Sequence, residues 1–297
     1  MEIGVFAKTF ARPTLDAVLD AVVAYGLRTV QFNLVCAGLP SMPDQIDPAL
    51  VASIRQAFSQ RGLTMAAVSG TFNMIHPDPA QRRRGLARLR VLAKACADLG
   101  TSIITLSTGT RDAADMWRAH PANHSAEAWA DLLTAMTVAV HIAEDADVTL
   151  AFEPEVSNVV DSAVRARRLL DEMASPRLKV VMDGANLFHA GELPQMTRIL
   201  HEAFDLLGGD IVLAHAKDLL HDGEAGHAAA GQGVLDYDLY LRLLGASGYD
   251  GALILHGLSE AQVAGSVAFL RARWEQIDTA KLTSAAFADE SAHQDMV

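Results

Sequence analysis

The sequence is poor in cysteine and contains no long apolar run. Cys36 and Cys96 are its two cysteines, too few for the disulfide framework of a small secreted protein. No stretch reaches the roughly 18 uninterrupted apolar residues of a membrane span. The first ten residues, MEIGVFAKTF, lack the basic start and the long apolar segment of a secretory signal. We therefore expect reduced thiols, a cytoplasmic location and no membrane partner.

Basic residues are also in deficit. The chain has 24 Lys and Arg against 36 Asp and Glu, which gives a formal net charge of −12 at pH 7. A general nucleic-acid surface needs clustered basic side chains that neutralise phosphates, so we expect no nucleic-acid partner. The glycine-rich phosphate turn of a doubly wound dinucleotide-binding fold is missing as well.

What the sequence does contain is a regular alternation of strand-like and helical patterns. The expected strands are 1–7, 29–33, 64–71, 102–107, 148–155, 178–183, 211–215 and 252–256. The expected helices are 14–26, 48–61, 79–99, 125–146, 161–173, 194–207, 237–246 and 259–274. Eight strands that alternate with eight helices predict a single α/β domain, a (β/α)₈ TIM barrel. We assign residues 1–282 to the barrel and expect 283–297 to be a flexible C-terminal tail.

Four consecutive expected strands end on a potential metal ligand. Their apolar runs stop at Glu153, Asp183, His215 and His256. Each residue alone is more often a cap, an ion-pair partner or a hydrogen-bonded core residue than a ligand. In a barrel, however, the carboxyl ends of the strands converge on one face. Two carboxylates and two imidazoles suit a divalent ion, and they favour Mn²⁺, Co²⁺ or Zn²⁺ over Mg²⁺.

Five motifs resemble those of a known family. They are FEPE at 152–155, MDGANL at 182–187, HAKD at 215–218, GQGVLDY at 231–237 and GYDGALILHG at 248–257. The chain is similar to the sugar-phosphate isomerase/epimerase family, the xylose-isomerase-like TIM barrels that include ketose 3-epimerases and hydroxypyruvate isomerase. The resemblance covers nearly the whole chain and is strongest after residue 148.

The resemblance implies a metal site at the strand ends, held by Glu, Asp, His and a second Glu. The first three ligands carry over to Glu153, Asp183 and His215. The chain departs from the family at two positions: His256 stands where the second glutamate is expected, and Asn186 stands where a histidine is frequent. The metal-bound glutamates of the family often also transfer protons. We therefore expect Glu153 and His256 to be catalytic.

Further polar residues near the expected strand ends are candidates for substrate contacts: Lys217, Asn186, His76, Asn33 and Arg111. A structural ion pair is an equal alternative for Lys217, and a loop-stabilising role is an equal alternative for His76. Glu155 is expected to point away from Glu153 and to lie outside the ligand group.

The function that the resemblance implies is isomerisation or epimerisation of a sugar or a related hydroxy-carbonyl compound. Proton abstraction next to the carbonyl would give an enediolate. The alternatives are a dehydratase or lyase with the same site and a non-catalytic barrel. A hydrolase that resembles the AP endonucleases is weaker, because it needs more metal ligands and a DNA-binding surface. A homo-oligomer is possible; the sequence leaves the oligomeric state open.

Overall fold

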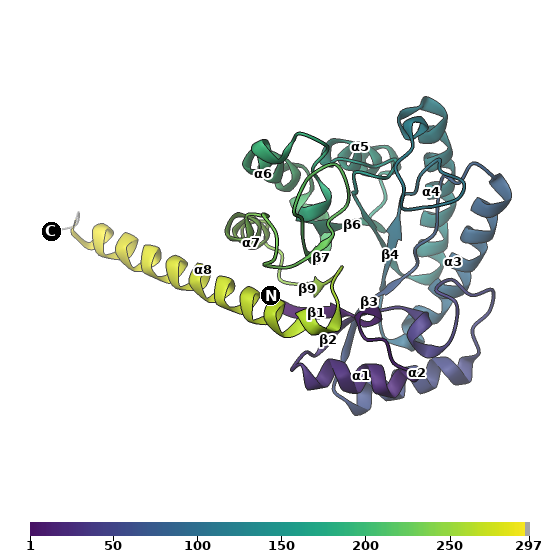
Figure 1. Ribbon diagram of the computed structural model, residues 1–297, viewed down its shortest axis with the longest axis horizontal. Coiled ribbons are helices and arrows are strands. Elements are labelled where there is room, and N and C mark those ends of the chain that lie inside the picture. Colours follow the sequence, from purple (N-terminus) through teal and green to yellow (C-terminus); the bar gives the residue numbers. More distant parts are fainter. Residues whose placement is uncertain (295–297) are drawn as a thin grey trace.

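The computed structural model describes the backbone of residues 1–294 and the side chains of residues 1–277. Eight parallel strands close into a barrel around which the helices form an outer ring (Figure 1). The strands are β1 (Glu2–Phe6), β2 (Thr29–Phe32), β3 (Thr64–Ser69), β4 (Ile103–Ser107), β5 (Thr149–Glu153), β6 (Leu178–Asp183), β7 (Ile211–Asp218) and β9 (Ala252–Leu255). β6 pairs with β7, β7 with β9 and β9 with β1, which closes the ring. The predicted TIM barrel is confirmed.

The helices follow the strands in the predicted order. They are α1 (Leu15–Ala24), α2 (Pro48–Gln60), α3 (Pro79–Leu99), α4 (Ala126–Ala146), α5 (Ala163–Met173), α6 (Met196–Leu207), α7 (Tyr237–Ala246) and α8 (Glu260–Gln294). Side chains cap several of their amino-terminal ends; Thr14 and Ser125, for example, accept hydrogen bonds from the first turns of α1 and α4. The cap of α5 is Ser162 rather than the predicted Asp161.

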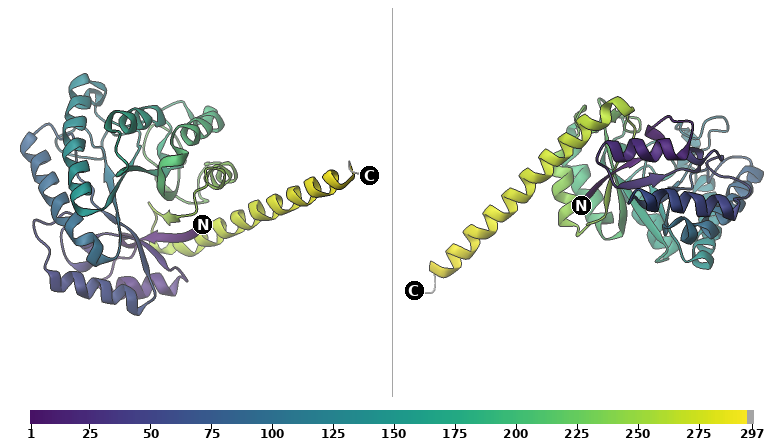
Figure 2. Two further views of the ribbon diagram at one scale, coloured as in Figure 1. Left: turned by 180° about the vertical axis from the view of Figure 1, so that it is seen from behind. Right: turned by 90° about the horizontal axis from the view of Figure 1, so that it is seen from below.

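Two elements differ from the prediction. A two-residue strand, β8 (Ala228–Ala229), pairs antiparallel with the end of β7. The last helix, α8, was expected to end near Trp274 but continues to Gln294 and runs out beyond the barrel (Figure 2). The segment 283–294 is therefore helical, its mobility stays a prediction, and residues 295–297 lie outside the described part. No helix in the described residues is long and apolar enough to cross a bilayer.

The barrel interior explains why the ligand-type residues converge. A small apolar cluster inside the barrel includes Ala151, Val181, Leu213 and Ile254, all at most 1% exposed. Each of these residues stands two positions before a strand-end residue that was singled out in the sequence. Side chains two residues apart lie on the same face of a strand. The layer above the apolar cluster is therefore formed by Glu153, Asp183, His215 and His256.

Candidate functional site

A cavity of about 580 Å³ opens at the carboxyl ends of the strands. Its walls come from β1–β5 and β7 and from the loops that follow several strands, so residues from distant parts of the chain meet there. The lining residues are Phe6, Lys8, Gln31, Asn33, Ser41, Ser69, Thr71, Thr105, Leu106, Ser107, Met116, Trp117, Glu153, Glu155, His215, Lys217, Ala225 and His256.

Glu153, Asp183 and His215 form a compact group of possible metal ligands. His215 Nδ1 lies 3.3 Å from Glu153 Oε1 and 3.5 Å from Asp183 Oδ2. One donor atom of each residue lies within 4.8 Å of the other two. A tetrahedral ion with bonds of about 2.1 Å holds its ligand atoms about 3.4 Å apart. The spacing and chemistry of the three donors therefore fit a divalent metal ion.

The local backbone orients the Asp183 carboxylate. Its Oδ1 accepts a hydrogen bond of 3.0 Å from the Ala185 N–H at the start of the short 3-10 helix η4 (Gly184–Asn186). Its Oδ2 is buried and accepts no hydrogen bond, although Lys217 Nζ lies 3.0 Å away as an ion-pair partner. One oxygen is thus fixed by the fold, and the other is directed toward the centre of the group.

Two basic side chains, His215 and Lys217, lie beside the two carboxylates of Glu153 and Asp183. Lys217 Nζ also lies 3.6 Å from Glu153 Oε1. Burial alone would lower the pKa of His215, but Glu153 and Asp183 outweigh it and raise that pKa to about 9. Burial also opposes the charge of Lys217, yet the same two carboxylates raise its pKa. In return, Lys217 and His215 overcome burial and lower the pKa of both carboxyl groups.

The second ring nitrogen of His215 is held by a residue from the other side of the barrel. His215 Nε2 lies 2.8 Å from Gln31 Oε1, and Gln31 Nε2 donates to Thr105 Oγ1 at 3.3 Å. Since the Gln31 amide nitrogen is used on Thr105, its oxygen is the acceptor for the Nε2–H of His215. This arrangement leaves Nδ1 of His215 as the nitrogen that faces the carboxylates, as expected for an oriented metal ligand.

His256 lies in the cavity but outside this compact group. Its ring stacks between those of Phe6 and His215, with centroid distances of 4.8 Å and 4.7 Å. Its Nδ1 is buried and has no hydrogen-bond partner. Burial, assisted by the positive charges of His215 and Lys217, holds the pKa of His256 well below its usual value. The geometry therefore describes a neutral imidazole that faces the cavity.

Asn186 holds Glu153 in place. Its Nδ2 donates to Glu153 Oε1 at 2.5 Å, and its Oδ1 accepts a bond of 2.8 Å from the Gly226 N–H. This side chain does not line the cavity. It connects Glu153 to the loop that follows β7.

Glu155 lines the cavity, so the expectation that it points away from Glu153 is wrong. Side chains two residues apart share a face of a strand, so the strand pattern itself favours the same side for Glu155 as for Glu153, where β5 ends. Glu155 is 5% exposed, and its Oε1 has no hydrogen-bond partner. Burial raises the pKa of Glu155 to about 7, and the charge of Glu153 adds to this shift.

The other predicted substrate residues divide into two groups. Asn33 and Lys217 line the cavity. The structure does not bring His76 and Arg111 to it. The ring of His76 bonds to the Ala113 carbonyl and the Asp78 N–H, which stabilises its own loop. Arg111 donates to the Ile75 carbonyl and pairs with Asp131 at 2.6 Å.

Several lining residues carried no signal in the sequence. Gln31, Thr105 and Ser107 lie within strands and resemble ordinary polar strand residues. Only the closed barrel shows that they face inward near its carboxyl end. Trp117 stands in a long loop, and 56% of its surface is exposed at the mouth of the cavity.

Residues 19–273 match the family described as "Xylose isomerase-like TIM barrel". The chain belongs to this family. The resemblance drawn from the sequence motifs is thereby confirmed. A ketose 3-epimerase from Arthrobacter globiformis is 24% identical over 233 residues, which are 76% of this xylose isomerase-like chain and 75% of that protein.

Two solved structures share the fold. An L-ribulose 3-epimerase matches with a TM-score of 0.71 at 17% identity, over 96% of this chain and 97% of that chain. The IOLI protein, solved with a bound zinc atom, matches with a TM-score of 0.69 at 15% identity, over 93% and 98% of the two chains.

Proposed function

We propose that this xylose isomerase-like barrel is a metal-dependent isomerase or epimerase of a ketose or a closely related sugar. One observation carries the proposal: Glu153, Asp183, His215 and Lys217 converge at the carboxyl ends of β5, β6 and β7, where Glu153, His215 and Lys217 line a single cavity. The similarity to a ketose 3-epimerase supports the substrate class.

The ion would be held by Glu153, Asp183 and His215, with His256 as the fourth candidate ligand. Their mixed oxygen and nitrogen donors favour Mn²⁺, Co²⁺ or Zn²⁺. A bound divalent ion supplies Lewis-acid polarisation of the substrate carbonyl. The zinc found in the IOLI protein supports an ion of this kind in the fold.

The proposed base is Glu153. Lys217 and His215 keep its pKa low, so the carboxylate is ionised at neutral pH and can accept a proton from the carbon next to the carbonyl. Asn186 fixes the orientation of this carboxylate. The Lys217 ammonium lies close enough to neutralise the oxyanion that develops in the enediolate.

Returning the proton decides between the two reactions. Delivery to the neighbouring carbon isomerises the sugar, whereas delivery to the opposite face of the same carbon inverts it. His256 is the candidate for the second transfer, since its neutral ring faces the cavity and its Nδ1 is free of protein partners. A neutral imidazole has one unprotonated ring nitrogen that can accept a proton.

The cavity walls suit a polyhydroxyl compound. Their polar side chains include Asn33, Ser69, Thr71, Thr105, Ser107 and Glu155. The unpartnered Oε1 of Glu155 offers an acceptor for a substrate hydroxyl. Burial of such an acceptor without a partner is unfavourable, so a hydroxyl that bonds it would contribute to selectivity.

The test is turnover of a ketose panel by metal-loaded protein in D₂O, followed by NMR. We expect deuterium at the reacting carbon of product or recovered substrate. We also expect Glu153→Gln to lower kcat by about 100-fold or more, with a smaller effect on bound metal. Glu127→Gln, an exposed glutamate on α4, is the control. Turnover without any deuterium, or products that have lost water, would overturn the proposal.

A further inference from the structure

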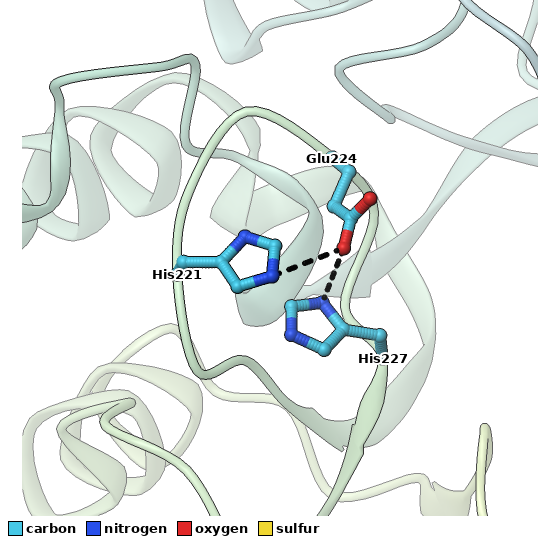
Figure 3. A group of neighbouring side chains, drawn as sticks. All are labelled: His221, Glu224 and His227. Carbon is cyan, nitrogen blue, oxygen red and sulfur yellow. Dashed lines mark ion pairs between the residues drawn. The ribbon is translucent and has the colours of Figure 1, made fainter.

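A second group of possible metal ligands lies outside the cavity, on the loop between β7 and β8. It consists of His221, Glu224 and His227, which come from the segment HDGEAGH (Figure 3). The two imidazole rings lie on the same side of the Glu224 carboxylate, with ring centroids 4.4 Å apart. None of the three residues takes part in the proposed reaction.

The distances within this group match metal coordination better than hydrogen bonding. Glu224 Oε1 lies 3.4 Å from His221 Nε2 and 3.3 Å from His227 Nδ1. Hydrogen bonds between such atoms are usually about 2.7–3.2 Å long. Ligand atoms around a tetrahedral Zn²⁺ are about 3.4 Å apart. The same spacing occurs in the group formed by Glu153, Asp183 and His215.

The side chains have room to complete a coordination shell. Those of His221 and Glu224 are 62% and 56% exposed, and that of His227 is 27% exposed. In the present arrangement the Leu220 N–H donates to His227 Nε2. Coordination through Nδ1 would move the ring proton to Nε2 and free that N–H. Leu220 is 60% exposed, so water can replace the lost acceptor.

The loop backbone is already held in shape without an ion. The Leu193 N–H donates to Asp222 Oδ2 at 2.8 Å. Gly223 adopts φ +90°, which other residues rarely adopt. Gly226 packs so closely that an added Cβ would meet the Ala185 side chain at 2.6 Å. The ligands therefore project from a backbone whose conformation is largely fixed, which lowers the entropic cost of binding.

We propose that His221, Glu224 and His227 form a second metal site, in which a borderline divalent ion is bound by two imidazoles, one carboxylate and solvent. This ligand set favours Zn²⁺ among the common divalent ions. The site is distinct from the proposed catalytic site, because the two share no ligand.

Metal binding at this loop would affect the cavity and Glu153 through two contacts. Ala225, next to Glu224, lines the cavity. The Gly226 N–H bonds to Asn186, which in turn bonds to Glu153. An ion that joins residues on both sides of this segment restrains one wall of the cavity. We therefore expect Zn²⁺ to slow hydrogen exchange of the amides in 219–227.

The test is Zn²⁺ titration of the full chain after removal of metal with a chelator. Wild type, His221→Ala/His227→Ala and the control His141→Ala/Glu144→Ala are compared. His141 and Glu144 are an exposed pair on α4 with a 3.1 Å contact, and no third ligand joins them among the described residues. We expect wild type and control to bind two equivalents, and the loop variant to bind one.

Failure of this site and failure of the proposed function give different results. If the cavity binds no ion, wild type binds one equivalent and the loop variant none, and the loop site stands. If the loop variant binds as many equivalents as wild type, with equal affinity and equal protection of 219–227, the loop site is overturned. The loop variant carries no change in the cavity, so its circular dichroism should match that of wild type.

Discussion

The imidazole rings of His215 and His256 stack face to face, with centroids 4.7 Å apart and planes inclined by 15°. The two rings differ in their contacts. His215 Nδ1 faces two carboxylates, whereas His256 Nδ1 has no hydrogen-bond partner. Neighbouring histidines on adjacent strands thus have opposite electrostatic environments, and their pKa values are moved in opposite directions. Such divergence is typical of groups with separate roles in acid–base chemistry.

His256→Phe separates proton transfer from metal binding. Phenylalanine keeps the ring between Phe6 and His215 but removes both nitrogens. We expect kcat to fall by about 100-fold or more. The metal affinity, measured by titration, should not change. The exposed His201→Phe on α6 is the control. A fall in metal affinity of about tenfold or more would instead make His256 a ligand, the other role that the sequence predicts for it.

Lys217→Met tests whether the Lys217 ammonium group compensates the negative charges of Glu153 and Asp183. Breaking a buried ion pair by removing one partner costs about 3 kcal/mol or more. We expect that loss in the free energy of urea unfolding for metal-free protein, because Glu153 and Asp183 lose a buried positive charge. Added divalent metal should restore much of the loss by binding the folded state.

The control for this experiment is Lys179→Met. Lys179 pairs with Asp210 at 2.6 Å, but its side chain is 28% exposed and Arg167 also pairs with Asp210. We expect a smaller loss there, independent of metal. Equal losses for Lys217→Met with and without metal would show that the ammonium and the ion do not compensate the same charges.

The alternation of apolar strand-like runs with helical patterns was sufficient to predict the fold. It could be used because each strand is buried on both faces, so its apolar run stops where the barrel stops. The register then brings Asp183 opposite His215. The roles assigned to these residues stay predictions.

Contacts that depend on side-chain direction across the barrel could not be predicted. His215 and Gln31 are 184 positions apart in sequence and meet only because the barrel closes. Glu155 was misplaced because side chains two residues apart share a face of a strand, whereas the prediction put Glu155 on the face opposite Glu153. The capping of α5 depended on which of two adjacent residues, Asp161 or Ser162, has the required backbone direction.

Both cysteine thiols should react slowly with alkylating reagents. Burial raises the pKa of Cys36 to about 11 and that of Cys96 to about 12. At pH 8 Cys36 then has about 100-fold less thiolate than an unperturbed cysteine. We expect iodoacetamide to label Cys36 slowly, with a rate that rises with pH up to about 11, and to label Cys96 only after unfolding. Fast labelling of either thiol at pH 8, detected by mass spectrometry, would contradict this expectation.

Gly226→Ala should be destabilising because the loop after β7 lies directly on the site. An added Cβ would meet Ala185 Cβ at 2.6 Å and Asn186 Oδ1 at 3.4 Å. Overpacking of this kind costs about 1–3 kcal/mol, and we expect that loss in urea unfolding. Movement of Asn186 should also weaken metal binding in the cavity by about tenfold.

Gly265→Ala is the matched control, since Gly265 lies in α8 and an added Cβ there meets no atom within 4 Å. Alanine in a helix is favoured over glycine by up to about 1 kcal/mol, so this variant should be slightly more stable than wild type. The two substitutions are chemically identical and differ only in what surrounds the new methyl group. If both changed stability equally, the close packing of Gly226 against Ala185 and Asn186 would be unimportant. The loop would then be free to move without affecting Glu153.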